Sequence, residues 1–234
     1  MSPKAPIVLA LDTSDLTMAI GWVKATEGLI SVYKLGLEFF LTFGQDGVKA
    51  VASETDSDIF LDLKLHDIPH TVSGAARAIT ELAPKYVTVH ALGGGAMVAA
   101  AVAALPSTLV TGVTILTSLS DTDVTALGFK ANALESATGL ATVAVNSGAR
   151  AIVCSPLEIR AIRKRVGLQI IIITPGVRPS DSESVDDQSR TLTPQEAIER
   201  GANLVVIGRP ITSFWKQGPA AMRGRVESIC AQIL

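Results

Sequence analysis

Short apolar segments typical of buried β-strands recur along the whole chain. Eight can be recognised, each built mainly from Val, Ile and Leu, and they occupy residues 7–11, 30–36, 58–64, 86–90, 109–116, 151–154, 168–174 and 203–208. Near-continuous apolar runs of this length are typical of parallel strands covered on both faces. The chain is therefore expected to build a buried parallel sheet, in which helices connect successive strands.

The segments between these runs have the composition of helices. Ala- and Leu-rich stretches with Gly or Pro near their ends occupy residues 37–53, 69–83, 94–105, 131–148, 156–166 and 193–201. Eight strand–helix repeats at a spacing of roughly 25–30 residues are typical of the (β/α)8 TIM barrel, for which about 250 residues is usual. An open doubly wound sheet is the alternative, but its usual glycine-rich first turn is missing, because the first turn here reads ALDTSDLT.

Nothing in the sequence divides the 234 residues into smaller units. We find no linker, charge block or low-complexity tract. The sequence therefore predicts an α/β protein with a single barrel domain over residues 1–234 and an active site at the C-terminal ends of the strands.

Charge and hydropathy exclude several classes of partner. A formal net charge of −2 predicts no general attraction to nucleic acid or to an anionic membrane. The most apolar stretches, residues 96–105 and 167–177, are shorter than the roughly 20 residues of a membrane helix, and the N-terminal apolar stretch is too short for a secretory signal. The two cysteines, Cys154 and Cys230, do not suggest a disulfide framework. We expect a soluble cytoplasmic protein.

Charged residues stand inside runs where a purely structural role would favour apolar ones. Lys34 lies in YKLG, and Asp62 and Lys64 lie in LDLKLHD, which alternates polar and apolar residues. A regular strand over 61–67 would place Asp62, Lys64 and His66 on one face and the leucines on the other. Buried charges are costly unless they are paired, and a Lys–Asp–Lys–Asp array completed by Asp67 meets that condition. The pattern favours an active site over an ion-pair network that only fills the barrel.

Two histidines close together in the sequence are candidate metal ligands. His66 and His70 in HDIPH have the spacing of a two-histidine helical metal motif. Pro69 argues against that interpretation, because proline lacks the backbone donor of a helix interior and suits the first helical position. We expect no metal site here. His90, at the end of a strand, is equally compatible with a core position and with a supporting position beside the site.

Two late segments have features of anion-binding loops. They are TPGVRPSDSESVDDQSRTLTP (174–194), after the seventh strand, and IGRPITSFW (207–215), after the eighth. Barrels of this type frequently bind phosphate with these two loops. Gly208 permits close approach of the backbone, while Arg178 and Arg209 carry planar guanidinium groups suited to phosphate oxygens. The sequence predicts a phosphate site formed by both loops.

The loop at 174–194 is unusually long for a compact domain. Its middle, DSESVDD, is acidic and rich in serine. We interpret it as a lid that closes over a bound phosphate, and a tolerated surface insertion is the alternative.

The segment DLKLHDIPHT (62–71) resembles the signature of orotidine 5'-monophosphate decarboxylases of the bacterial type. Further matches to that family cover essentially the whole chain: ALD near the start, YKLG, VTVHA, LTS, TPGVRP, DDQ and VIGRPIT. The D-x-K-x-x-D core is also found in sugar-phosphate decarboxylases and synthases of the same barrel superfamily. Lys34 and the PGVRP–DDQ–GRPIT set favour the orotidylate branch.

The resemblance implies a reaction, an assembly and a set of catalytic residues. The reaction is the conversion of orotidine 5'-monophosphate (OMP) to UMP and CO2 in pyrimidine biosynthesis, without metal or organic cofactor. Lys34, Asp62, Lys64 and Asp67 would form the charged array, with Lys64 as the proton donor to C6 of the pyrimidine. The protein would be a homodimer in which Asp67 and Thr71 reach the partner's site.

The resemblance also implies residues that bind the substrate. Asp12 and Lys34 would hold the ribose hydroxyls, and Thr117 would lie at the pyrimidine. The phosphate and the closing loop would be held by Arg178, Gln188, Gly208 and Arg209.

Two other functions fit parts of the sequence. A metal-dependent sugar-phosphate decarboxylase or aldolase of the same superfamily would be expected to carry an acidic metal ligand near the second strand, where this chain has Lys34. A non-catalytic phosphate-binding barrel would use the charged array only as an ion-pair network.

Overall fold

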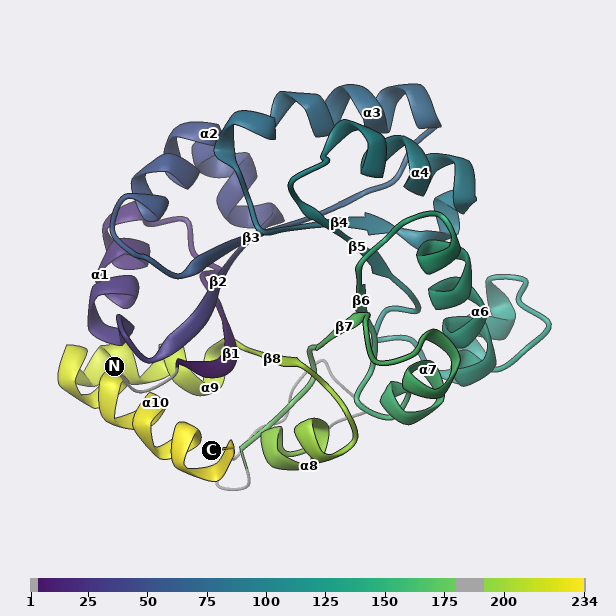
Figure 1. Cartoon of the computed structure of the whole chain (residues 1–234). Helices are drawn as coiled ribbons and strands as arrows, with labels where there is room; N and C mark the ends of the chain where they lie inside the picture. Colours follow the sequence, from purple (N-terminus) through teal and green to yellow (C-terminus); the bar gives the residue numbers. More distant parts are fainter. Residues whose placement is uncertain (1–3, 180–191, 234) are drawn as a thin grey trace.

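The structure is a computed structural model that describes residues 4–179 and 192–233. Eight parallel strands form a closed barrel in sequence order (Figure 1). The strands are β1 (Ala5–Ala10), β2 (Ile30–Gly36), β3 (Asp58–Leu65), β4 (Tyr86–His90), β5 (Leu109–Val113), β6 (Ala151–Val153), β7 (Ile171–Thr174) and β8 (Leu204–Ile207). Because β8 pairs with β1, the sheet has no open edge. The predicted (β/α)8 barrel is confirmed.

Helices surround this barrel as an outer ring (Figure 1). The α-helices are α1 (Leu16–Thr26), α2 (Leu37–Ala52), α3 (Pro69–Ala78), α4 (Gly94–Ala104), α5 (Asp121–Ala126), α6 (Ala133–Asn146), α7 (Ile159–Val166), α8 (Pro194–Glu199), α9 (Arg209–Thr212) and α10 (Pro219–Ile233). Short 3-10 helices are η1 (Thr80–Leu82), η2 (Ala91–Gly93) and η3 (Ser213–Gln217). None of the described helices is long and apolar enough to cross a membrane.

Each segment predicted to be helical contains a helix, but α1, α5, α9 and α10 lie outside those segments. The two longest of these, α1 and α10, carry local start signals. Asp15 caps α1 by accepting a hydrogen bond from the backbone N–H of Met18 at 2.9 Å, and Pro219 is the first residue of α10. Figure 1 shows α10 beside α1, so that the last helix completes the ring next to the first.

Alternation along the strands divides the apolar core into two layers. Ile7 and Leu9 belong to the large layer between the strands and the helices. Val8 between them belongs to a smaller cluster drawn from nearly all strands, which can meet only inside the barrel. That inner cluster consists of Val8, Val32, Phe60, Tyr86, Ala151, Ile173 and Leu204.

The inner apolar cluster determines where the polar site begins. Side chains two residues apart share a face of a strand. The residues two positions after Val32, Phe60 and Tyr86 are Lys34, Asp62 and Thr88. The inward face of β2, β3 and β4 thus changes from apolar to polar towards the C-terminal end of the barrel, which explains why charges occur inside apolar runs.

Candidate active site

A cavity of about 280 Å³ opens at the C-terminal end of the barrel. Its walls come from nearly every strand end and from the connections that follow them. It is lined by Ala10, Asp12, Lys34, Phe60, Asp62, Lys64, Val113, Ile115, Leu116, Thr117, Val153, Cys154, Pro175, Gly176, Arg178, Val206, Gly208, Arg209 and Pro210. In barrels of this architecture, active sites lie at this end.

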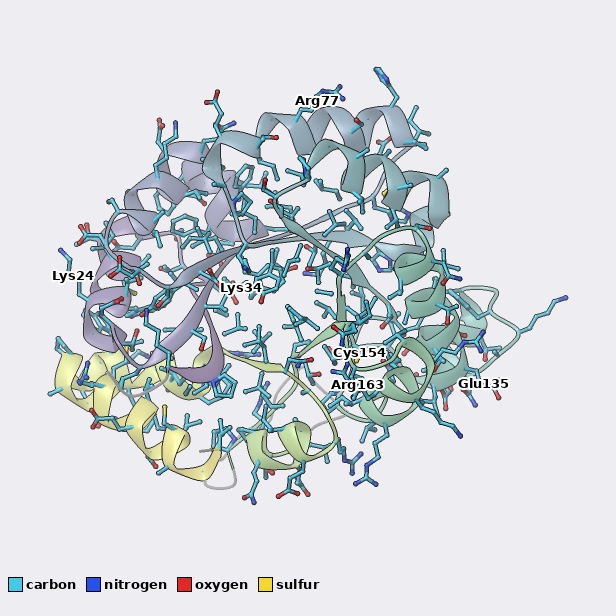
Figure 2. All side chains as sticks on the ribbon, in the orientation of Figure 1. Lys24, Lys34, Arg77, Glu135, Cys154 and Arg163 are labelled. Atoms are coloured by element: carbon cyan, nitrogen blue, oxygen red, sulfur yellow. The ribbon has the colours of Figure 1, made fainter. Side chains whose placement is uncertain are left out.

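Three charged side chains form a compact ion-paired group in this cavity. The Nζ of Lys34 lies 3.5 Å from Oδ2 of Asp62, and the Nζ of Lys64 lies 2.9 Å from Oδ1 of the same carboxylate. Lys34 also pairs with Asp12, with 3.1 Å between Nζ and Oδ1. Figure 2 shows Lys34 extending from β2 into the interior of the barrel. Asp62 is therefore held between two ammonium groups.

The surroundings of Lys34 and Asp62 keep both of these side chains charged. Burial by itself lowers the pKa of Lys34, but the carboxylates of Asp62 and Asp12 outweigh burial and raise that pKa above its ordinary value. Burial by itself would raise the pKa of Asp62. Lys34, Lys64 and the hydrogen bonds to the carboxylate outweigh burial, so the pKa of Asp62 lies below its ordinary value. At neutral pH the site thus presents a fixed pattern of opposite charges.

The backbone of Lys64 is unusual. Its φ is 47°, in the left-handed region that residues other than glycine seldom adopt, and such a conformation costs roughly 1–2 kcal/mol. The pairing of β3 with β4 shifts register between Leu61 and Leu65. The regular alternation expected for LDLKLHD therefore ends at Lys64, and the prediction that His66 shares the face of Asp62 and Lys64 is wrong. His66 is exposed and follows the end of β3.

The two histidines near β3 and β4 pack on each other. The rings of His66 and His90 are stacked, with 5.4 Å between their centroids. Burial, followed by the influence of His66 and Lys64, lowers the pKa of His90. Pro69 begins α3, as predicted, so His66 and His70 do not share a helical face. The described residues contain no group of three or more His, Cys, Asp or Glu side chains that could hold a metal ion.

Most of the predicted site residues meet in the cavity. Those that line it are Asp12, Lys34, Asp62, Lys64, Thr117, Arg178, Gly208 and Arg209. Asp67 and Thr71 are exposed and do not line the cavity of their own chain as described. Gln188 and most of the predicted lid lie outside the described residues.

The ends of the long connection after β7 lie side by side at the cavity. Val177 forms an isolated parallel bridge with Leu192, and the backbone N–H of Arg178 donates to the carbonyl of Leu192 at 2.8 Å. Arg178 lines the cavity together with Arg209, which follows the neighbouring strand β8. Two arginines, one following β7 and one following β8, thus line the cavity.

Three residues of the site were not singled out from the sequence. A Cβ at Gly36 would lie 3.0 Å from Oδ1 of Asp12 and 3.1 Å from Nζ of Lys34, so glycine leaves room for that ion pair. Cys154 lines the cavity, but burial raises the pKa of its thiol. Thr88 is fully buried beside Asp62. The glycine of YKLG was a usable signal, whereas nothing local marked the threonine or the cysteine.

The chain is similar to known proteins over nearly its whole length. Residues 5–221 match the model of the orotidine 5'-phosphate decarboxylase / HUMPS family. An orotidine 5'-phosphate decarboxylase of Thermobifida fusca (strain YX) is 48% identical over 93% of this chain and 93% of its own. One of Frankia casuarinae is 44% identical over 93% of this chain and 85% of its own. The crystal structure of the Lactobacillus acidophilus orotidine 5'-phosphate decarboxylase superposes with a TM-score of 0.82 at 31% identity, covering 98% of this chain and 99% of that one. The chain therefore belongs to the orotidine 5'-phosphate decarboxylase / HUMPS family.

Proposed function

We propose that the protein is a carboxy-lyase that converts OMP to UMP and CO2, a step of pyrimidine biosynthesis, in the cytoplasm. The observation that carries this proposal is the Lys34–Asp62–Lys64 group at the mouth of the barrel. A relative with the name orotidine 5'-phosphate decarboxylase is 48% identical over 93% of the chain. Site and family thus point to the same reaction.

The proposed chemistry follows from the charges. When the bond between C6 and the carboxyl carbon breaks, CO2 leaves and the electron pair stays at C6 as a carbanion in the plane of the ring. The ammonium group of Lys64 faces the cavity and would stabilise that developing charge. It would then donate a proton to C6 to give UMP. Asp62, 2.9 Å from Nζ of Lys64, orients the ammonium group.

The remaining predicted residues would bind the substrate away from the reacting carbon. Asp12 and Lys34 would hold ribose hydroxyls, and Thr117 would contact the pyrimidine. Arg178 and Arg209, with Gly208 between strand and helix, would hold the phosphate, assisted by Gln188 and the closing loop. Binding energy from the phosphate can then be used at the reacting centre.

The proposed reaction needs no metal or organic cofactor. The ammonium group of Lys34, 3.5 Å from Asp62, would repel a divalent cation bound to that carboxylate. This argues against the metal-dependent sugar-phosphate enzyme, which remains the second candidate because its superfamily carries the same D-x-K-x-x-D core.

The test is an ultraviolet assay of OMP loss with purified protein, with and without excess EDTA. We expect equal rates in both, because Lys64 would supply the charge and the proton. Loss of activity in EDTA that is restored by added Mg²⁺ would favour the second candidate, and no consumption of OMP in either assay would refute the proposal.

We further propose that the protein works as a homodimer. Apolar side chains are exposed around the connection from β3 to α3, with Ile68 65% exposed and Leu41 on α2 80% exposed. Leu37 and Leu92 are also exposed, on the neighbouring α2 and η2. The segments that carry these side chains follow three neighbouring strands, β2, β3 and β4, and exposed apolar groups on adjacent segments are typical of an interface. Asp67 lies in this connection, where a second copy could receive it.

Mixing two inactive variants tests whether Asp67 serves the partner. In a heterodimer of Lys64→Ala and Asp67→Asn chains, one site lacks both groups and the other retains both. Random mixing forms such heterodimers in half of the dimers, so we expect about one quarter of wild-type activity to return. The rate of OMP loss is measured before and after the two proteins are unfolded and refolded together.

The control is a mixture of Asp67→Asn with the double variant Lys64→Ala/Asp67→Asn, in which no site is complete. Heterodimer formation is verified by mass spectrometry of differently tagged chains. Absence of recovery in verified heterodimers would show that Asp67 does not act across an interface.

A further inference from the structure

Thr88 on β4 stands opposite the irregular part of β3. The two strands pair regularly at Phe60 with Tyr86 and at Leu61 with Val87, but the next pair is Leu65 with Val89. Residues 62–64 of β3 therefore face Thr88 alone. The backbone N–H of Lys64 lies in this stretch, where the regular ladder to β4 is interrupted.

The hydroxyl of Thr88 replaces the missing ladder contact. The N–H of Lys64 donates to Oγ1 of Thr88 at 2.8 Å, and Oγ1 donates its proton to Oδ1 of Asp62 at 3.0 Å. The Nζ of Lys64 donates to the same Oδ1 at 2.9 Å. These contacts close a ring in which the backbone and the ammonium group of Lys64 are both tied to one carboxylate oxygen. Thr88 is completely buried, so water does not compete for these bonds.

Lys64 has particular need of such a contact. Its left-handed backbone is strained, and strained residues persist only where their surroundings hold them. A buried N–H without a partner would be a further penalty. One hydroxyl satisfies the N–H and at the same time supplies a donor to Asp62. The ring fixes the direction from which Nζ of Lys64 enters the cavity.

We infer that Thr88 is a positioning residue for the proposed decarboxylation, acting through Lys64 and Asp62 and not by contact with the substrate. This inference rests on the proposed function. Thr88 is absent from the residues that line the described cavity, which accords with an indirect role. The hydroxyl should therefore matter for the chemical step and little for substrate binding, which Asp12 and the two cavity arginines would provide.

The experiment compares Thr88→Val, which keeps the shape and removes the hydroxyl, with Thr88→Ser, which keeps the hydroxyl. We expect Thr88→Val to lower kcat for OMP by roughly 10–100-fold with KM within about threefold of wild type. We expect Thr88→Ser to retain kcat within about threefold, because both hydrogen bonds can form.

A second readout follows proton transfer directly. If Lys64 protonates C6, the reverse step exchanges the C6 hydrogen of UMP with solvent, which proton NMR in D2O detects. We expect this exchange to slow in Thr88→Val about as much as kcat does, since both depend on the position of the ammonium group. A purely structural role would lower the midpoint of unfolding without slowing exchange in the protein that remains folded.

Thr111 provides a matched control. It is fully buried on the neighbouring β5, and its hydroxyl donates to the carbonyl of Leu109 on its own strand at 2.9 Å. Thr111→Val should leave kcat and the C6 exchange rate within about twofold of wild type, because the hydroxyl of Thr111 bonds to a carbonyl of its own strand and not to Lys64 or Asp62.

The outcomes separate the inference from the function on which it rests. No decarboxylation by the wild type would refute the function itself. With an active wild type, equal kcat values for Thr88→Val and Thr88→Ser would overturn the role of the hydroxyl. If Thr88→Val does not fold, Thr88→Ala takes its place, and the same comparison with Thr88→Ser decides.

Discussion

Replacing Lys64 by alanine is expected to reduce turnover of OMP by at least about 10⁴-fold. The variant loses the cation that faces the cavity 2.9 Å from Asp62 and, with it, the proposed proton donor. Asp62 keeps Lys34 as a partner at 3.5 Å, so the buried carboxylate is not left without a counterion. The loss should therefore appear in kcat of a folded protein, measured by ultraviolet absorbance and circular dichroism.

A surface lysine gives the matched control for this substitution. Lys24 on α1 also forms an ion pair, at 3.1 Å from Glu54, but it lies outside the barrel (Figure 2). Lys24→Ala should leave turnover within about twofold, since exposed ion pairs contribute little. If folded Lys64→Ala retained turnover within about tenfold of wild type, Lys64 could not be the proton donor.

Replacing Asp62 by alanine is expected to damage both stability and activity. The carboxylate is the shared counterion of Lys34 and Lys64, and its side chain is only 15% exposed. Its removal leaves the ammonium group of Lys34 buried with Asp12 alone, and breaking a buried pair in this way lowers the free energy of unfolding by about 3–5 kcal/mol. Urea unfolding measures the stability, and kcat should fall by at least about 100-fold because Lys64 loses its orienting partner.

Asp12→Ala is the matched control, because Asp12 also pairs with Lys34 but its side chain is 56% exposed. We expect it to lower the free energy of unfolding by less than about 1 kcal/mol. Equal losses of unfolding free energy in Asp62→Ala and Asp12→Ala would show that burial does not increase the contribution of Asp62 to stability.

The stability difference between wild type and Asp62→Ala should depend on pH in one direction. The pKa of Asp62 is lowered in the folded protein relative to its ordinary value of 3.8. Its contribution is therefore fully present above pH 3.8 and is lost as the pH falls through the lowered folded value. The urea midpoints of wild type and Asp62→Ala should differ by about the same amount at pH 7 and at pH 5. In stronger acid the two midpoints should converge.

The barrel could be predicted from the sequence because the signal is repeated. Each buried strand is an apolar run, and an error in one strand boundary does not alter the number or order of the eight strand–helix repeats. Boundaries differ by a few residues, as for the seventh strand, which was expected to begin at residue 168 and begins at Ile171. Among the helices outside the predicted segments, α1 and α10 were missed because their start signals are single residues and not long periodic patterns.

The site was predictable where a residue departs from its local pattern. Lys34 and Asp62 occupy inward positions directly after apolar ones, and that contrast is visible in the sequence. The contribution of Thr88 and the end of the alternation at Lys64 were not visible, because both depend on how β3 pairs with β4. A shift of register between two strands leaves no mark in either strand read alone.

At the left-handed backbone of Lys64, the residue that would best stabilise the fold differs from the residue that the proposed reaction needs. Glycine adopts positive φ without a steric penalty, so a sequence optimised for the stability of this barrel alone would favour glycine at position 64. Lysine at position 64 lowers the stability of the fold, but it supplies a positive charge that glycine cannot. A designer who transplants the site to another barrel must therefore reproduce the irregular β3 backbone as well as the side chains, because a regular strand would aim the same lysine elsewhere.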